Sequence, residues 1–188
     1  SSGRDVSNIA SVASFFVSRL DTVVDGLLQQ LIDDGVTGVN ALFGKAAIAN
    51  AKLAYRDFSR DFATDRFVTL QSNGAKPQRP LWASTSTKNP NYRDVLYVEA
   101  LIGSNTVNTM TPSTISVFLD HGRPSITIDQ EVQKAGYIFD SLKSHGINME
   151  RITDQLLVDG VKLFADSYDK LIKNIEQKMG NQLLELYD

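Results

Sequence analysis

Cysteine is absent from the 188 residues, which excludes disulfides, thiolate catalysis and cysteine-based metal sites. Histidine occurs twice, as His121 and His145, so a catalytic metal centre built mainly from imidazole is not expected. The net charge of −3 and the pI of about 5.4 argue against a nucleic-acid partner. No apolar run approaches the roughly 20 residues that cross a bilayer, and the polar first residues do not resemble a signal peptide. We therefore expect neither a nucleic-acid nor a membrane partner.

The composition and length are those of a globular chain that can bury a core. Hydrophobic residues make up 42% and charged residues 22%, close to the average of folded domains. A complete eightfold β/α barrel usually needs about 250 residues. If the elements follow a barrel pattern, the 188 residues are too few to form the whole of one.

Three short segments are predicted to be buried strands, and the first of them is an apolar run rich in aromatic and β-branched residues. They span residues 11–17, 79–84 and 106–110, so all three precede residue 123. Pro80 lies near the start of the second segment, where a missing N–H does least harm. Helical patterns separate the segments, and this alternation predicts parallel strands with right-handed crossovers.

Four helices are predicted before residue 123. Asp21 is expected to cap the first, after a short loop at residues 18–20, and Thr111 is expected to cap the last. Carboxylate pairs on the helices are expected to be solvated. The four helices are predicted at residues 21–34, 44–62, 92–102 and 111–121.

The remainder of the chain is predicted to be helical. Apolar residues recur at helical spacing in three stretches, 132–142, 152–157 and 164–179. The chain therefore divides into a β/α part, residues 1–122, and a helical part, residues 123–188.

Ligands of parallel α/β proteins gather at the carboxyl ends of the strands. At the first such end, alternation places Ser14, Phe16 and Ser18 on one face. Arg19 follows beside a helix N-terminus, where a guanidinium suits a phosphate or a carboxylate. At the second end, residues 84–89 offer four hydroxyls, Lys88 and an asparagine, which also suit a phosphate.

Structural alternatives apply to each of these residues. Arg19 could be a solvated surface arginine, and residues 84–89 could be a turn-rich loop. Ser14 has no histidine near it in sequence, so a nucleophilic role is not favoured. Lys88 stands beside Asn-Pro in a loop and is expected to be exposed, which disfavours a Schiff-base role.

Four motifs occur in an order that resembles the transaldolase family. The first resembles its strand six, the second the helix that follows, and the last two its strands seven and eight. The similarity runs from about residue 3 to the end and is closest to the longer transaldolases of plants, cyanobacteria and actinobacteria. The motifs are residues 11–22 (SVASFFVSRLDT), 44–55 (GKAAIANAKLAY), 79–90 (RPLWASTSTKNP) and 106–110 (TVNTM).

The resemblance implies the C-terminal part of a (β/α)8 TIM barrel. Residues 1–122 would form the last three β/α units, and residues 123–188 a helical extension packed on the barrel. The family transfers a dihydroxyacetone unit from sedoheptulose 7-phosphate to glyceraldehyde 3-phosphate in the pentose phosphate pathway, giving erythrose 4-phosphate and fructose 6-phosphate. The reaction proceeds through a Schiff base on a lysine, without a metal or organic cofactor. A cytoplasmic or plastid location would follow, whereas the oligomeric state is not predicted.

The family's site residues map onto five positions. The resemblance implies that Ser14 and Phe16 line the pocket and that Arg19 and Ser84 contact the substrate phosphate. Better-studied family members have an arginine soon after the serine that corresponds to Ser84. In this chain the nearest cation is Lys88, with two additional residues intervening, and Lys88 is therefore assigned a phosphate role. No catalytic residue is expected in this chain.

The family's Schiff-base lysine lies on strand four, its proton-transfer groups on strands one and three, and none of these strands has a counterpart here. The expected partner is therefore the N-terminal half of the same protein, and this chain alone is expected to be inactive. One alternative is a noncatalytic half-barrel that binds a sugar phosphate or a protein partner. Another is a related class I aldolase or fructose-phosphate lyase.

Overall fold

A computed structural model describes residues 5–185 of the chain, with side chains described to residue 179. The fold is α/β, with one three-stranded parallel sheet in the order β1-β2-β3. The strands are β1 (Val12–Phe16), β2 (Arg79–Ala83) and β3 (Val107–Asn108). The prediction of three parallel strands is confirmed, although each strand is shorter than its predicted segment.

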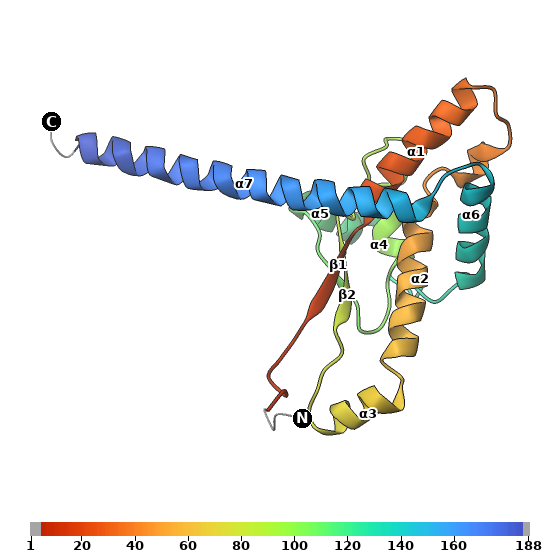
Figure 1. The fold of residues 1–188 in the computed structure, drawn as a ribbon, viewed down its shortest axis with the longest axis horizontal. Helices are drawn as coiled ribbons and strands as arrows, with labels where there is room; N and C mark the ends of the chain where they lie inside the picture. The colour runs from red at the N-terminus through yellow and green to blue at the C-terminus, as the bar shows by residue number, and fades with distance from the viewer. Residues whose placement is uncertain (1–4, 186–188) are drawn as a thin grey trace. The chain divides into compact units, whose positions relative to one another are not determined.

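Helices account for most of the remaining structure (Figure 1). Those predicted at residues 44–62, 111–121 and 132–142 are confirmed as α2, α5 and α6, whereas α3 was not predicted. The described helices are α1 (Val17–Asp33), the 3-10 helix η1 (Val39–Leu42), α2 (Ala46–Asp61), α3 (Asp65–Ser72), α4 (Leu96–Ala100), α5 (Pro112–His121), α6 (Val132–Ser144) and α7 (Met149–Glu185).

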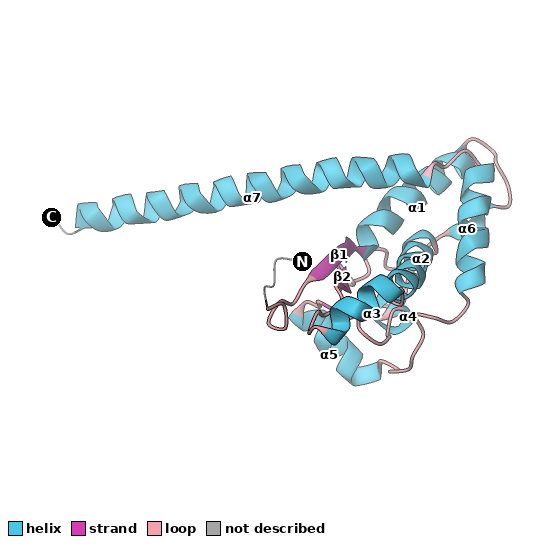
Figure 2. Cartoon of the chain, turned by 60° about the horizontal axis from the view of Figure 1, so that its bottom comes forward, coloured by secondary structure: helices cyan, strands magenta, loops and turns pink. Residues whose placement is uncertain are grey.

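The covered face of the sheet holds the central part of the core. Phe15 and Trp82 lie in register, their ring centroids are 5.4 Å apart, and Trp82 is fully buried. Helix α2 lies between the sheet and α6 (Figure 2). The buried side of α2 is rich in alanine, which allows the close approach of neighbouring helices. Its buried alanines are Ala46, Ala47, Ala49 and Ala51.

The opposite face of the sheet is incompletely covered. Val12 and Ser14 are exposed there, and Leu81, in register with Ser14 and Val107, is half-buried. Within residues 5–185 the outer edges of β1 and β3 pair with no further strand. Unpaired edges beside a partly apolar face favour association with more chain.

Two predictions about the helices before residue 123 are wrong. Helix α1 begins at Val17 directly after β1, without a loop at residues 18–20, and Asp21 lies in its second turn. Residues 92–102 are helical only in α4, and turns precede it, among them one in which the Asn89 side chain accepts a hydrogen bond from Asn91 N–H at 2.9 Å.

The chain divides into two compact units, with the boundary between Met149 and Glu150. The sheet and helices α1 to α6 belong to the first unit, and the second contains α7. The two separate stretches predicted at residues 152–157 and 164–179 form one continuous helix of 37 residues. Gly160, which lies between them, disfavours a helix by about 1 kcal/mol without ending it.

Candidate functional site

Arg19 and Phe16 meet where β1 passes into α1. The guanidinium carbon of Arg19 lies 4.4 Å from the centroid of the Phe16 ring, a cation–π contact. Among the residues that the structure describes, no carboxylate pairs with Arg19. The flat, ring-supported guanidinium can therefore offer its hydrogen-bond donors to an anionic ligand.

Ser14 precedes Phe16 by two residues, so the two side chains leave β1 on the same face. Ser14 is exposed on the incompletely covered face, and Phe16 is half-buried. A ligand bound by Arg19 would have the Phe16 ring as a wall and the Ser14 hydroxyl further along the strand.

Ser84 follows β2 and adopts a left-handed backbone conformation, with φ of 53°. This conformation costs a residue other than glycine about 1–2 kcal/mol, and such strain clusters at functional sites. The carbonyl of Ser84 accepts a hydrogen bond of 3.0 Å from Ser18 N–H in the first turn of α1. The structure therefore brings Ser84 to the helix that carries Arg19.

The two residues after Ser84 are fixed on the other side, towards β3 and α5. The buried Thr85 hydroxyl donates to Asn108 Oδ1 at 2.9 Å. Ser86 Oγ lies 2.6 Å from the hydroxyl of Thr114, in the first turn of α5. The N-terminal cap predicted for α5 is confirmed, because Thr111 Oγ1 accepts from Thr114 N–H at 3.3 Å. The end of β2 is thus tied to both of its neighbours in the sheet.

Lys88 lies on an exposed loop, as expected for a lysine beside Asn-Pro. Among the described residues, none forms an ion pair or hydrogen bond with it. The structure therefore brings Phe16, Arg19 and Ser84 together, and Lys88 only onto the loop that follows. Lys88 lines a hollow of about 430 Å³ with Thr87, Asn89, Pro90, Tyr92, Arg93 and Asp94.

Asp21 is a buried carboxylate of α1 that contacts α2 and α4, although it was expected to cap α1. Asp21 accepts hydrogen bonds from Ala47 N–H at 2.7 Å and from the Tyr97 hydroxyl at 2.8 Å. It thus caps α2 instead of α1. Burial raises the pKa of Asp21 to about 6, although both hydrogen bonds oppose the increase.

One turn further along α1, Asp25 forms a second, similar set of contacts. It accepts from Gly44 N–H at 3.0 Å and from the Tyr92 hydroxyl at 2.6 Å. The spacing of four residues between Asp21 and Asp25 is visible in the sequence, but their partners lie 19 to 76 residues away. The expectation that carboxylate pairs are solvated is wrong for Asp21, which is 1% exposed.

Lys52 is the amine that sequence analysis did not single out. Its side chain is buried against α6, and burial lowers its pKa. Its Nζ donates to the carbonyls of Thr127 and Gln130, at 2.8 and 2.7 Å. Because Lys52 projects from α2 and not from a strand end, we interpret it as holding the segment before α6 in place.

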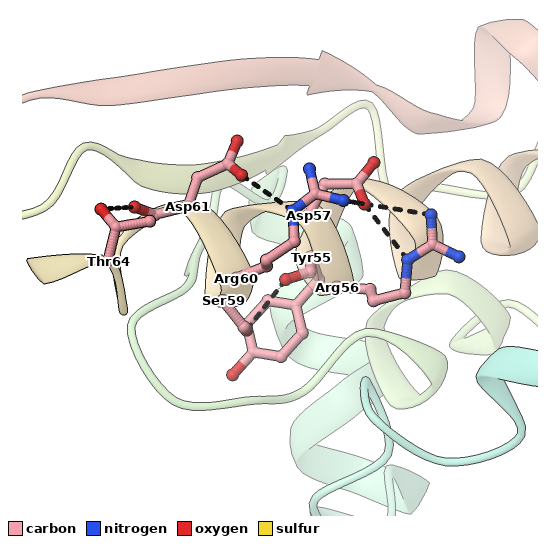
Figure 3. Close-up of polar contacts among 7 residues, drawn as sticks. All are labelled: Tyr55, Arg56, Asp57, Ser59, Arg60, Asp61 and Thr64. Atoms are coloured by element: carbon pink, nitrogen blue, oxygen red, sulfur yellow. Dashed lines mark hydrogen bonds and ion pairs between the residues drawn. The ribbon is translucent and has the colours of Figure 1, made fainter.

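The charged face of α2 is a solvated surface (Figure 3). Asp57 pairs with Arg56 at 3.0 Å and with Arg60 at 3.3 Å, and all three side chains are at least 42% exposed. Arg60 also pairs with Asp61 at 3.0 Å. Exposed pairs of this kind contribute little to stability and do not form a site.

The described part of the chain contains no group of three or more histidine, aspartate or glutamate side chains arranged to hold a metal ion. Nor does any of its helices have the length and apolarity needed to cross a membrane.

Comparison with known proteins decides the family. The family model "Transaldolase/Fructose-6-phosphate aldolase" matches residues 4–175. The chain belongs to this family. The resemblance to transaldolases inferred from the sequence is therefore confirmed.

Individual transaldolases share more than two fifths of their matched residues with this chain. One from Parafrankia sp. is 47% identical over 180 residues, which cover 95% of this chain and 48% of the relative. One from Trichodesmium erythraeum is 44% identical over 184 residues, 94% of this chain and 48% of the relative. Transaldolase 2 from Nostoc sp. is 42% identical over 185 residues, which cover 94% of this chain and 49% of the relative. The chain spans about half the length of the curated relatives it matches.

Proposed function

We propose that this chain supplies the phosphate-binding end of a transaldolase active site. The observation that carries the proposal is the guanidinium of Arg19, stacked on Phe16 and without a described carboxylate partner. Ser84 is held beside the same helix by its bond to Ser18. The substrates would be the sugar phosphates of the family reaction, sedoheptulose 7-phosphate and fructose 6-phosphate among them.

Each residue has a distinct role in this proposal. Arg19 forms charge-assisted hydrogen bonds to the phosphate oxygens, and its contact with Phe16 limits the orientations it can adopt. Ser84 donates its hydroxyl to the same phosphate. Ser14, further along the strand, lines the pocket around the sugar chain, and Lys88 adds a point charge from its loop. Binding the phosphate away from the reacting carbon orients the substrate for the chemical step.

The reactive amine is proposed to lie outside this chain. In the family it is a lysine on strand four of a (β/α)8 barrel, and we propose that β1, β2 and β3 correspond to strands six, seven and eight. Residues 1–122 would then be the last three β/α units, and residues 123–188 a helical extension packed on the barrel. The unpaired edges of β1 and β3 within the described residues support a partner that continues the sheet on both sides. That partner would be the N-terminal half of the same protein, in the cytoplasm or a plastid.

The family description leaves a second activity to consider, because it includes fructose-6-phosphate aldolase. An aldolase would cleave fructose 6-phosphate, whereas a transaldolase passes the three-carbon unit to an aldose phosphate. The relatives cited above are all transaldolases, which favours transfer. A noncatalytic half-barrel has no comparable support.

A joined protein tests the activity directly. It consists of the part of the Parafrankia transaldolase that precedes its match to this chain, fused ahead of residues 1–188. We expect it to convert fructose 6-phosphate and erythrose 4-phosphate into sedoheptulose 7-phosphate and glyceraldehyde 3-phosphate, and the 188-residue chain alone to be inactive. Cleavage of fructose 6-phosphate without an acceptor would support an aldolase, and a well-folded joined protein without either activity would favour the noncatalytic alternative.

Replacing Ser84 by glycine tests its proposed role in binding. Glycine adopts the left-handed conformation without strain, so Ser84→Gly removes the hydroxyl and leaves the backbone intact. We expect the joined protein to bind fructose 6-phosphate about 5- to 10-fold more weakly, the effect of one lost hydrogen bond, with no loss of thermal stability. Titration calorimetry measures the affinity, and Ser59→Gly on the exposed face of α2 is a control for a lost surface hydroxyl. Equal affinities of Ser84→Gly and the parent would contradict the assignment.

A further inference from the structure

We propose that Tyr92 and Asp25 are positioning residues that hold the loop of residues 85–91, and with it Lys88, over the part of α1 that carries Arg19. This inference rests on the proposed function, because it concerns the same phosphate site. It assigns a role to a part-buried contact that the site residues themselves do not explain.

Both ends of the loop are attached to one helix. At the first end, the Ser84 carbonyl accepts from Ser18 N–H at 3.0 Å. At the second end, the Tyr92 hydroxyl donates to Asp25 Oδ2 at 2.6 Å. Ser18 and Asp25 are seven residues apart on α1, which is about 10 Å along the helix axis. The chain therefore leaves α1 near Ser18 and returns to it at Asp25, and Arg19 lies between these two attachment points.

Lys88 is the central residue of this loop, four residues from each of Ser84 and Tyr92. A chain of four residues spans at most about 14 Å, so two anchors confine Lys88 closely. If Tyr92 is released, the next described contacts are those of Arg93 with Glu99 and of Asp94 with His121, neither of which involves α1. The next described contact with α1 is that of Tyr97 with Asp21, nine residues from Lys88. Without the Tyr92 contact, no described bond ties residues 87–92 to α1, so Lys88 could move away from the site.

The other end of the loop does not depend on Tyr92. Thr85 is fixed to Asn108 and Ser86 to Thr114, as described above. The turn at Asn89 involves only neighbouring residues, since the Asn89 carbonyl accepts from Tyr92 N–H at 3.1 Å. The Tyr92 side chain is thus the described contact that ties the second half of the loop to α1.

The surroundings of Tyr92 are shaped to hold its ring. Gly44 adopts φ of 64°, and a Cβ at this position would lie 2.8 Å from Cζ of Tyr92. Glycine therefore leaves room for the ring, and its N–H donates to the same Asp25 carboxylate. Burial and the Asp25 carboxylate both raise the pKa of Tyr92, which keeps its hydroxyl protonated as a donor.

Protection of Lys88 from acetylation tests the inference on the 188-residue chain. The chain is acetylated with increasing inorganic phosphate, the modification of Lys88 is read by peptide mass spectrometry, and the exposed Lys143 serves as an internal reference. Calorimetry on the same samples measures phosphate binding itself. Hydrogen exchange of residues 85–91 reports whether the loop is held.

Tyr92→Phe is expected to raise the phosphate concentration that half-protects Lys88 about fivefold and to accelerate exchange in residues 85–91. Asp25→Asn should have the same effect, and the double variant should add little, because both changes break one bond. The matched control is Tyr55→Phe, which removes a tyrosine hydrogen bond of 3.0 Å to the Ser104 carbonyl. It should alter neither measurement.

Unchanged exchange in Tyr92→Phe would overturn the inference, and so would faster exchange with unchanged protection. If phosphate binds the parent chain but does not protect Lys88, the inference fails while the proposed phosphate site at Arg19 stands. If calorimetry detects phosphate binding neither to the 188-residue chain nor to the joined protein, the inference and the proposed function both fail.

Discussion

Arg19→Ala is expected to weaken binding of fructose 6-phosphate to the joined protein about 10- to 150-fold. The change removes a charge-assisted contact with the phosphate, which contributes about 1.5–3 kcal/mol. Arg19 has no described carboxylate partner, so its removal leaves no buried charge behind and should not unfold the protein. Arg19→Lys should recover only part of the affinity, because an ammonium cannot form two parallel hydrogen bonds.

Titration calorimetry against fructose 6-phosphate and unphosphorylated fructose separates this effect from a general loss of binding. The loss should appear with the phosphorylated sugar and should shrink as salt is added. Arg66→Ala, which removes an exposed arginine from α3, is the matched control. Affinity for the phosphorylated sugar that is unchanged in Arg19→Ala would refute the phosphate assignment.

The second large effect is a dependence of stability on pH that Asp21→Asn should remove. Burial raises the pKa of Asp21 to about 6, above the value of about 3.9 in an unfolded chain. The folded state therefore binds this proton more tightly than the unfolded state. As the pH rises from about 3 to 7, the carboxyl group ionises more readily in the unfolded chain, and the free energy of unfolding falls by about 3 kcal/mol in total. Above about pH 7 this contribution is constant.

An asparagine at position 21 cannot ionise, yet its Oδ1 can still accept from Ala47 N–H. The difference in unfolding free energy between parent and Asp21→Asn should thus shift by about 2 kcal/mol between pH 4 and pH 6.5, to the disadvantage of the parent. Urea titrations at several pH values measure this difference. Asp33→Asn, at an exposed position of α1, should follow the parent at every pH. Parallel curves for the parent and Asp21→Asn would contradict the account.

The sheet was predictable because buried parallel strands are marked by local composition. The three strand segments are short and helical patterns separate them, so the parallel direction of the strands follows from general rules. Element ends were less predictable, because they depend on competing local bonds. Turns before Leu96 shorten the helix predicted from residue 92, and no breaker stronger than Gly160 ends α7 within the described residues.

The candidate site was predictable to the extent that it follows strand ends. Ser14, Phe16, Arg19 and Ser84 all lie at or just after β1 and β2, where ligands bind in parallel α/β proteins. The supporting contacts were not predictable, because they join residues far apart in sequence. Asp21 reaches Tyr97 across 76 residues, and nothing near Asp21 in the sequence marks it as buried.

The strained backbone of Ser84 was also beyond sequence analysis. Serine is not a residue that favours positive φ, so its left-handed conformation depends on the tertiary contacts around it. Ser18 on one side and the buried Thr85 on the other provide those contacts. The strain thus follows from holding the end of β2 between its two neighbours.

Borohydride trapping tests most directly whether the reactive amine lies outside this chain. The 188-residue chain and the joined protein are each incubated with fructose 6-phosphate, reduced, digested and mapped by mass spectrometry. The account predicts no adduct on the chain alone, and in the joined protein one adduct on a lysine contributed by the Parafrankia part. A stoichiometric adduct on a lysine of this chain, Lys52 and Lys88 included, would contradict it.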